Sequence, residues 1–181
     1  MIRTEFRKIL LDQRGAAVIL WSCFVISIPI YIVIARNVLE NPNIGSNRSF
    51  AASVRIVLWL LTIVDLGYYV YWRKRKFSSA SILRDARSTK LFRALEEFSG
   101  PVEERAAYVA STYVTRKVVI FAIIEAIAVY GFVSGILGRF VSDLYFLSMI
   151  SLVLLIIEFP SRNSLEELLR AVEQSPSESA A

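Results

Sequence analysis

The chain has 181 residues, of which 55% are hydrophobic, and its mean hydropathy of +0.52 exceeds that of a typical soluble domain of this size. It has a formal net charge of +5, no histidine and a single cysteine, Cys23. This composition excludes a disulfide framework and removes the commonest metal ligands and the commonest general base, so we expect no metal, no cofactor and no enzymatic activity.

Four apolar stretches are long enough to cross a hydrocarbon core of roughly 30 Å as helices. They predict an all-α membrane protein with four transmembrane helices, over residues 15–35, 56–72, 118–138 and 140–159. The first stretch could instead be a signal peptide, because basic residues precede it and Val33-Ile34-Ala35 loosely fits a cleavage site. Its length of about twenty apolar residues and its internal Pro29 favour a signal anchor.

Basic residues are distributed unequally between the two ends of these stretches. Four of the 21 precede the first stretch, eleven lie from Arg73 to Lys117, and two follow the fourth. The remaining basic residues are Arg36, Arg48, Arg55 and Arg139. The positive-inside rule therefore predicts that both termini and the loop between the second and third spans are cytoplasmic, as in a bacterial inner membrane protein.

The positive charge is thus explained by membrane topology, and we expect no nucleic-acid partner. The densest basic cluster directly follows the second stretch and consists of Arg73, Lys74, Arg75 and Lys76. We predict that this cluster contacts anionic lipid headgroups.

The chain divides into four predicted segments. Residues 1–72 form an N-terminal segment with the first transmembrane hairpin, 73–117 a basic helical cytoplasmic loop, 118–159 a second hairpin, and 160–181 an amphipathic helix with a disordered tail. Helical spacing from Pro101 runs into the third stretch, so one helix to about Gly138 would project into the cytoplasm. That projection would be a docking surface, unless the chain's own loop covers it. The acidic tail is predicted to touch the basic loop.

Two carboxylic acids interrupt membrane-length stretches. Asp65 lies eight residues before Arg73, and Glu125 lies eight residues after Lys117. Each acid is therefore about 12 Å from the cytoplasmic end of its span, and the two are predicted to share one depth. A carboxylate at the bilayer centre costs about 2.5–3.5 kcal/mol to insert. We expect Asp65 and Glu125 to be either polar contacts between helices or a proton or ion site.

The surroundings of these acids suggest partners for them. Thr62 and Tyr68 or Tyr69 are candidate hydroxyl donors to Asp65. Two further acids, Asp143 and Glu158, lie at the two ends of the fourth stretch, where we expect them to be close to water.

Small residues continue the helical face that carries Glu125. Spacings of three and four lead from Glu125 to Ala128, Gly131, Gly135 and Gly138. Gly131 and Gly135 form a small-xxx-small motif, which allows another helix to approach closely. We therefore expect Glu125 to point into a packed helix interface and not toward lipid.

The run EAIAVYGFV, residues 125–133, resembles the ion-carrying helix of the proteolipid (c-type) subunits of rotary ATPases, in which a glutamate precedes a similar run. The resemblance implies a proton- or sodium-binding role for Glu125. It covers nine of the 181 residues. The chain departs from that family because no glycine-rich helix precedes the run, a large loop intervenes and a fourth span follows. As a whole, the chain looks more like a small four-span bacterial membrane protein.

Two functions fit this pattern. The leading interpretation is a non-enzymatic accessory, assembly or scaffold subunit, whose partners are the lipid bilayer and either further copies or other membrane subunits. The alternative is proton- or ion-coupled transport that uses Asp65 and Glu125. An enzyme is disfavoured, because Val64-Asp65-Leu66-Gly67 lacks the sequence context of an intramembrane aspartyl protease, and no phosphate loop, metal cluster or nucleophile elbow is present.

Overall fold

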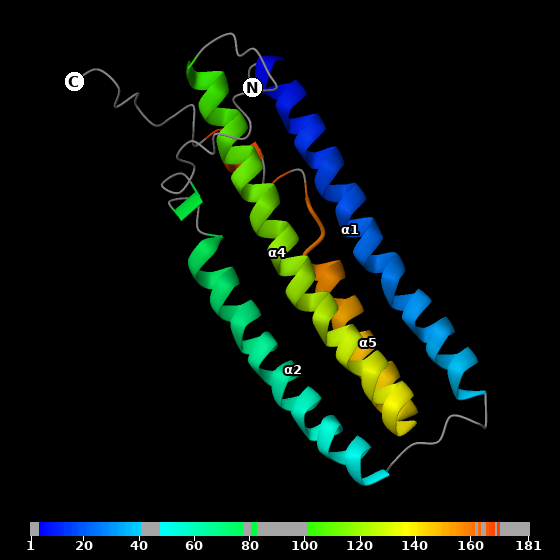
Figure 1. The fold of residues 1–181 in the computed structure, drawn as a ribbon. Helices are drawn as coiled ribbons and strands as arrows, with labels where there is room; N and C mark the ends of the chain where they lie inside the picture. Colours follow the sequence, from blue (N-terminus) through cyan, green and yellow to red (C-terminus); the bar gives the residue numbers. More distant parts are fainter. Residues whose placement is uncertain are drawn as a thin grey trace. The chain divides into compact units, whose positions relative to one another are not determined.

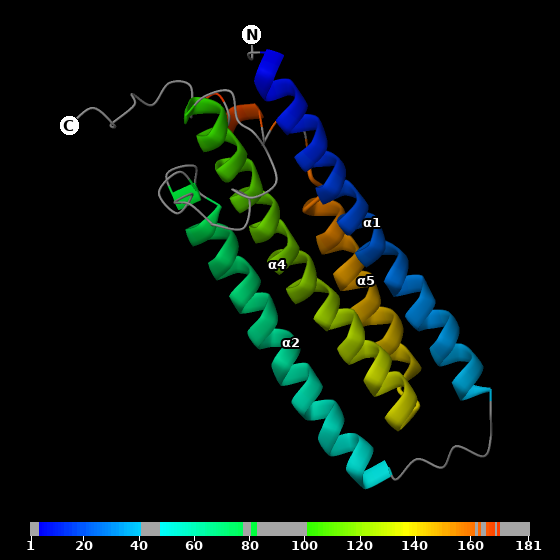
Figure 2. The same cartoon turned by 45° about the horizontal axis from the view of Figure 1, so that its top comes forward.

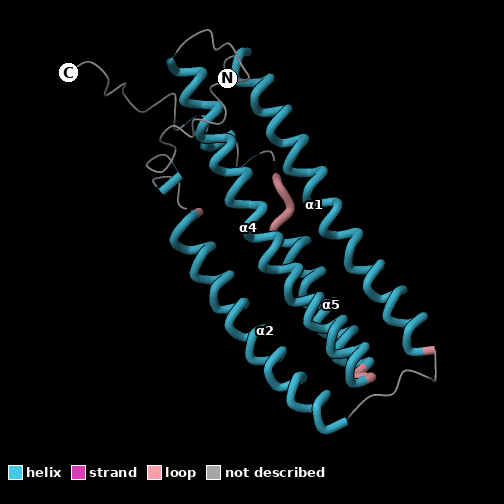
Figure 3. The backbone as a smooth tube through the Cα atoms, in the orientation of Figure 1, coloured by secondary structure: helices cyan, strands magenta, loops and turns pink. Residues whose placement is uncertain are grey.

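The protein is all-helical over the residues that the structure describes. The computed structural model, drawn in Figure 1, describes residues 4–40, 48–77, 81–82, 101–161, 163, 166–168 and 170. Its helices are α1 (Thr4–Leu39), α2 (Arg48–Lys76), α4 (Pro101–Gly138) and α5 (Val141–Ile157). Figure 3 distinguishes these helices from the short described loops, and the described residues include no strand. The predicted continuous helix from Pro101 to Gly138 is confirmed.

Three of these helices are long and apolar enough to cross a membrane. The qualifying stretches are Leu11–Leu39 in α1, Ser49–Lys76 in α2 and Ala106–Gly138 in α4. The fourth predicted span corresponds to α5, a shorter apolar helix of 17 residues, which is about 26 Å long. These helices indicate a multi-pass membrane protein.

The chain forms two compact units. Unit 1 contains residues 1–19, 73–118 and 160–181, and unit 2 contains residues 20–72 and 119–159. Unit 2 thus combines the two predicted transmembrane hairpins. The predicted 73–117 loop is described only at residues 73–77, at 81–82 and from 101 onward.

Within unit 2, the α4–α5 pair has α1 on one side and α2 on the other, as both Figure 1 and Figure 2 show. Hydrogen bonds connect α1 with both α4 and α5, and likewise connect α2 with both of them. Apolar side chains on α1 and α2 remain widely exposed on the isolated chain, among them Ile26, Val33, Ile56 and Val64. Such outward apolar surface suits lipid or another membrane helix.

The α4–α5 pair is a tight antiparallel hairpin. Only Arg139 and Phe140 separate the two helices, and Arg139 adopts a left-handed backbone conformation with φ of 55°. That conformation costs a non-glycine residue about 1–2 kcal/mol. The Arg139 guanidinium donates a hydrogen bond to the carbonyl oxygen of Leu39, at the end of α1.

The glycines of α4 permit the close approach of α5. A Cβ atom placed on Gly131 would lie 2.9 Å from the Cβ of Leu147, and one on Gly135 would lie 3.1 Å from the Cβ of Leu144. A methyl group at Gly138 would collide with the Phe140 ring. Ala128, on the same face, is fully buried. The small-residue stripe therefore packs against α5 of the same chain.

In unit 1, the first part of α4 is covered on all sides. Six consecutive residues, 106–111, are buried, which is more than one full helical turn. The open docking surface that we considered for this segment is therefore wrong, and the alternative of a segment covered within the chain agrees with its burial. Leu168 of the C-terminal segment is also buried, whereas Ser164 of the predicted capping box lies outside the described residues.

Candidate functional site

The most extensive polar contact in unit 2 surrounds Asp143, in the first turn of α5. Its side chain is only 4% exposed, and both of its oxygens accept hydrogen bonds from Arg55 of α2, from Nε at 2.6 Å and from Nη2 at 2.8 Å. This two-point contact matches the planar guanidinium to the planar carboxylate. The pair fastens α2 to α5.

Three further groups complete this contact, which we call the Asp143 cluster. Ser134 of α4 donates a hydrogen bond to Asp143 at 3.0 Å, and the Trp59 indole donates at 3.3 Å. The Arg55 guanidinium also lies 4.5 Å from the centre of the Phe140 ring, a favourable cation–π geometry. The Asp143 cluster therefore joins α2, α4 and α5 at one point.

Our expectation that Asp143 and Glu158 lie close to water is wrong for the chain as folded. Both are buried, with residue exposures of 3% and 4%. Glu158, just after α5, accepts a hydrogen bond of 2.8 Å from the Tyr69 hydroxyl of α2. The two acids thus hold α2 near both ends of α5.

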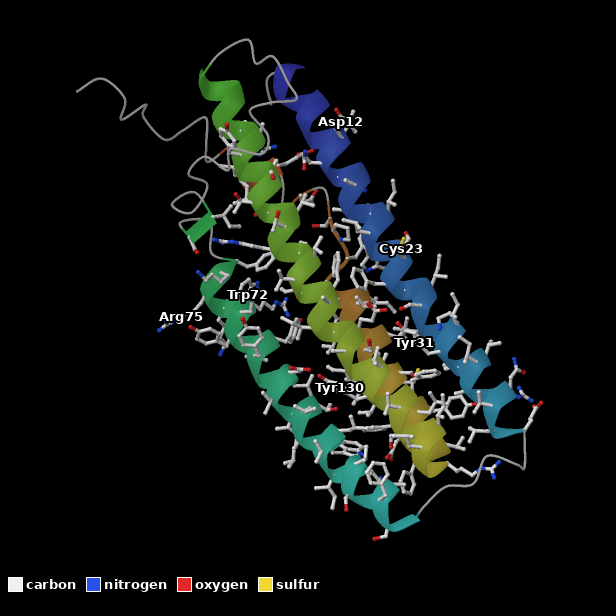
Figure 4. The ribbon with its side chains drawn as sticks, viewed as in Figure 1. Asp12, Cys23, Tyr31, Trp72, Arg75 and Tyr130 are labelled. Atoms are coloured by element: carbon white, nitrogen blue, oxygen red, sulfur yellow. The ribbon has the colours of Figure 1, made fainter. Side chains whose placement is uncertain are left out.

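Glu125 is bonded to α1. Its Oε1 atom accepts a hydrogen bond of 2.7 Å from the hydroxyl of Tyr31. The Tyr31 ring also packs 5.4 Å from that of Phe132, and Figure 4 shows Tyr31 lying between α1 and α4. Farther along α1, the Trp21 indole donates to the carbonyl oxygen of Leu155 at 2.8 Å. Together these contacts attach α1 to both helices of the hairpin.

Asp65 is bonded to α4 through a tyrosine that we did not predict as its partner. Tyr130 donates its hydroxyl to Asp65 Oδ2 at 2.9 Å, and Figure 4 shows this tyrosine on the side of α4 that faces α2. The candidate donors on α2 have other contacts. Thr62 bonds to the Leu58 carbonyl and Tyr69 to Glu158, while the Tyr68 ring packs against its aromatic neighbours Tyr71 and Trp72.

The two membrane-depth acids therefore have separate partners. Glu125 and Tyr130 are five positions apart on α4, which corresponds to about 140° around the helix. Glu125 is bonded on the α1 side and Tyr130 reaches Asp65 on the α2 side. Asp65 and Glu125 thus form two distinct contacts on different sides of α4.

The basic cluster of α2 belongs to unit 1. Arg73, Lys74 and Arg75 are exposed, and Lys76 is half-buried. The backbone carbonyl of Lys76 accepts a hydrogen bond from Arg116 of α4. The exposed side chains leave cationic charge at the surface of this unit.

The sequence contains a signal for the Asp143 cluster, although we did not predict the ion pair from it. Arg55 immediately precedes the second predicted span, and Asp143 lies near the start of the fourth. These two spans run in the same direction, so opposite charges at their corresponding ends can meet. The tyrosine partners have weaker signals, since each is a lone hydroxyl within an apolar run.

These contacts can hold helices together, and the Tyr–carboxyl pairs could also exchange protons. Among the described residues, no group of three or more His, Cys, Asp or Glu side chains is arranged to hold a metal ion. No protein-family model, no curated protein and no solved structure matches the chain. The resemblance of residues 125–133 to rotary ATPase proteolipids therefore gains no support beyond those residues.

Proposed function

We propose that this protein is a non-enzymatic, four-span inner membrane protein with cytoplasmic termini, acting as an accessory, assembly or scaffold subunit. The observation that carries the proposal is the use of all four acids of the predicted spans as cross-helix contacts. Asp65, Glu125, Asp143 and Glu158 each accept a hydrogen bond from a side chain on another helix. This arrangement suits a rigid body that presents apolar outer faces on α1 and α2 to membrane neighbours.

Native extraction tests this function directly. Solubilisation in a gentle detergent or in lipid discs, followed by mass measurement and identification of co-purifying chains, should recover a stable oligomer or a heteromeric complex. A lone monomer under both conditions would contradict the proposal.

Reporter fusions test the topology. A fluorescent protein fused after residue 181 or within residues 83–100 should be fluorescent, and alkaline phosphatase fused within residues 41–47 should be active, because the basic residues favour cytoplasmic placement of the former segments. The opposite pattern would overturn the proposed orientation.

The exposed basic residues Arg73, Lys74 and Arg75 support a role in anchoring the protein to anionic headgroups. Replacing all three by Gln should reduce the amount of anionic lipid that remains bound during purification. Retention equal to that of the unaltered protein would remove this role.

Proton- or ion-coupled transport is a second candidate, favoured by one observation. Glu125 and Asp65 are only half-buried, and each accepts a single hydrogen bond from a tyrosine, so neither is held by a permanent cation. Glu125→Gln keeps the size of the side chain but removes its titration. If reconstituted vesicles show a proton flux that this variant abolishes, transport is supported; an unchanged flux would exclude Glu125 as the carrier.

A further inference from the structure

The inner face of α5 carries one hydroxyl group whose hydrogen bonds are not satisfied. Ser148 is 2% exposed, and its Oγ atom has no hydrogen-bond partner. A serine in a helix often donates to the carbonyl four residues earlier, but Ser148 does not do so. An unpaired buried hydroxyl destabilises a folded protein, and such groups are commonly satisfied by an internal water molecule.

A second hydroxyl lies beside it on the same helix face. Ser151 follows Ser148 by three positions, a spacing that brings Cβ atoms to about 5–6 Å of each other. Ser151 is fully buried and donates its proton to the Ile124 carbonyl of α4 at 2.8 Å. A hydroxyl has one proton and two lone pairs, so Ser151 can still accept hydrogen bonds.

The opposite wall at this level is made by a small residue. α5 and α4 are antiparallel, and Leu147 meets Gly131 while Ser151 meets Ile124. Ala128 lies between Ile124 and Gly131 on α4, on the same helix face, and it is fully buried. Ser148 is therefore opposite an alanine, the smallest side chain that a residue with a Cβ can present.

We propose that a buried water molecule is bound between Ser148 and Ser151 at the α4–α5 interface. The water accepts the Ser148 proton and donates one of its own to Ser151 Oγ, so that every donor in the chain from Ser148 to the Ile124 carbonyl has an acceptor. The Leu144 carbonyl, one turn before Ser148, has a second lone pair that can accept the other water proton. This site goes beyond the proposed function, since it makes the seam between α4 and α5 hydrated and not purely apolar.

The position of Ser148 distinguishes it from the other unsatisfied buried groups of the described residues. These are the Arg14 Nε and Trp72 Nε1 atoms. Trp72 lies in the last two turns of α2, where solvent or lipid headgroups can supply a partner. Ser148 lies near the middle of α5, where lipid chains supply none, so an internal water is the partner that can reach it.

Radiolytic hydroxyl labelling of the full chain in lipid discs tests the site, because bound water generates radicals that oxidise adjacent side chains. Leu144 and Leu147 flank Ser148, and Leu155 is a reference of the same residue type and comparable burial. We expect oxidation of Leu144 and Leu147 at least threefold above that of Leu155, and a return to the Leu155 level in Ser148→Ala. Equal oxidation of the three leucines in the unaltered protein, or labelling unchanged in Ser148→Ala, would overturn the proposal.

Unfolding equilibria provide a second readout, with an outcome of opposite sign for a dry site. Ser148→Ala should raise the unfolding equilibrium constant about fivefold if it removes a water-mediated hydrogen bond. It should lower that constant if it merely removes an unsatisfied hydroxyl, and this result would refute the bound water. Ser27→Ala is the matched control, because the Ser27 hydroxyl donates to the Phe24 carbonyl of its own helix.

Discussion

The α4–α5 seam and the attachments of α1 and α2 are built in different ways. The seam depends on small residues and short distances, since Gly131 and Gly135 leave no room for a methyl group against α5. The outer helices depend on side-chain hydrogen bonds, which reach α1 through Glu125 and α2 through Asp65, Asp143 and Glu158.

This difference follows from the physics of association in lipid. Apolar surface gains little when it moves from lipid to protein, so helices associate through close packing or through hydrogen bonds. A glycine stripe supplies the first and a buried carboxylate supplies the second. The central hairpin uses the first with its serines as additions, and the two outer helices rely more on the second.

The largest expected effect concerns the Asp143 cluster. Asp143→Ala leaves the Arg55 charge without its partner and should reduce the free energy of unfolding by about 3–5 kcal/mol. The double variant Arg55→Met/Asp143→Leu removes both charges and should lose much less. Reversible unfolding in mixed micelles measures both. Equal losses in the single and double variants would contradict the ion-pair account.

The next effect concerns the seam. Gly131→Ala places a Cβ atom 2.9 Å from the Leu147 Cβ and 3.1 Å from the Asp143 carbonyl oxygen, so overpacking should cost about 1–3 kcal/mol. Gly135→Ala meets only the Leu144 side chain, from 3.1 Å, and should cost less. Gly67→Ala is the control, because nothing lies within 4 Å of its added Cβ and alanine favours the helix. A loss at Gly67 as large as that at Gly131 would contradict seam-specific packing.

A smaller effect is expected for the two tyrosine–carboxyl contacts. Tyr31→Phe and Tyr130→Phe each remove one hydroxyl and should each cost about 1 kcal/mol of unfolding free energy. Because the contacts lie on different sides of α4, the losses should add within about 0.5 kcal/mol in the double variant. A larger deviation from additivity would show that Asp65 and Glu125 belong to one coupled site.

Much of this architecture could be predicted because it depends on local sequence patterns. Long apolar runs predict helices, and the spacing from Pro101 correctly predicted one helix to Gly138. The stripe from Ala128 to Gly138 identified a packing face from one helix alone. That face then proved to serve α5 of the same chain.

The polar partners could not be predicted in the same way, because they depend on the rotation of one helix relative to another. Eight-residue counts predict a common depth for Asp65 and Glu125, but depth leaves the direction of each side chain open. Asp143 was expected at the water interface because it begins a helix, whereas Arg55 of a parallel helix buries it. Sequence distance along one helix carries no record of such a pairing.

The most direct test is a measurement of carbon–carbon distances by solid-state NMR in lipid bilayers. We predict short-range correlations between Arg55 Cζ and Asp143 Cγ, between Tyr31 Cζ and Glu125 Cδ, and between Tyr130 Cζ and Asp65 Cγ. The Asp65 and Glu125 carboxyl carbons should show none with each other. A short Asp65–Glu125 correlation without the two tyrosine correlations would contradict separate polar attachments for α1 and α2.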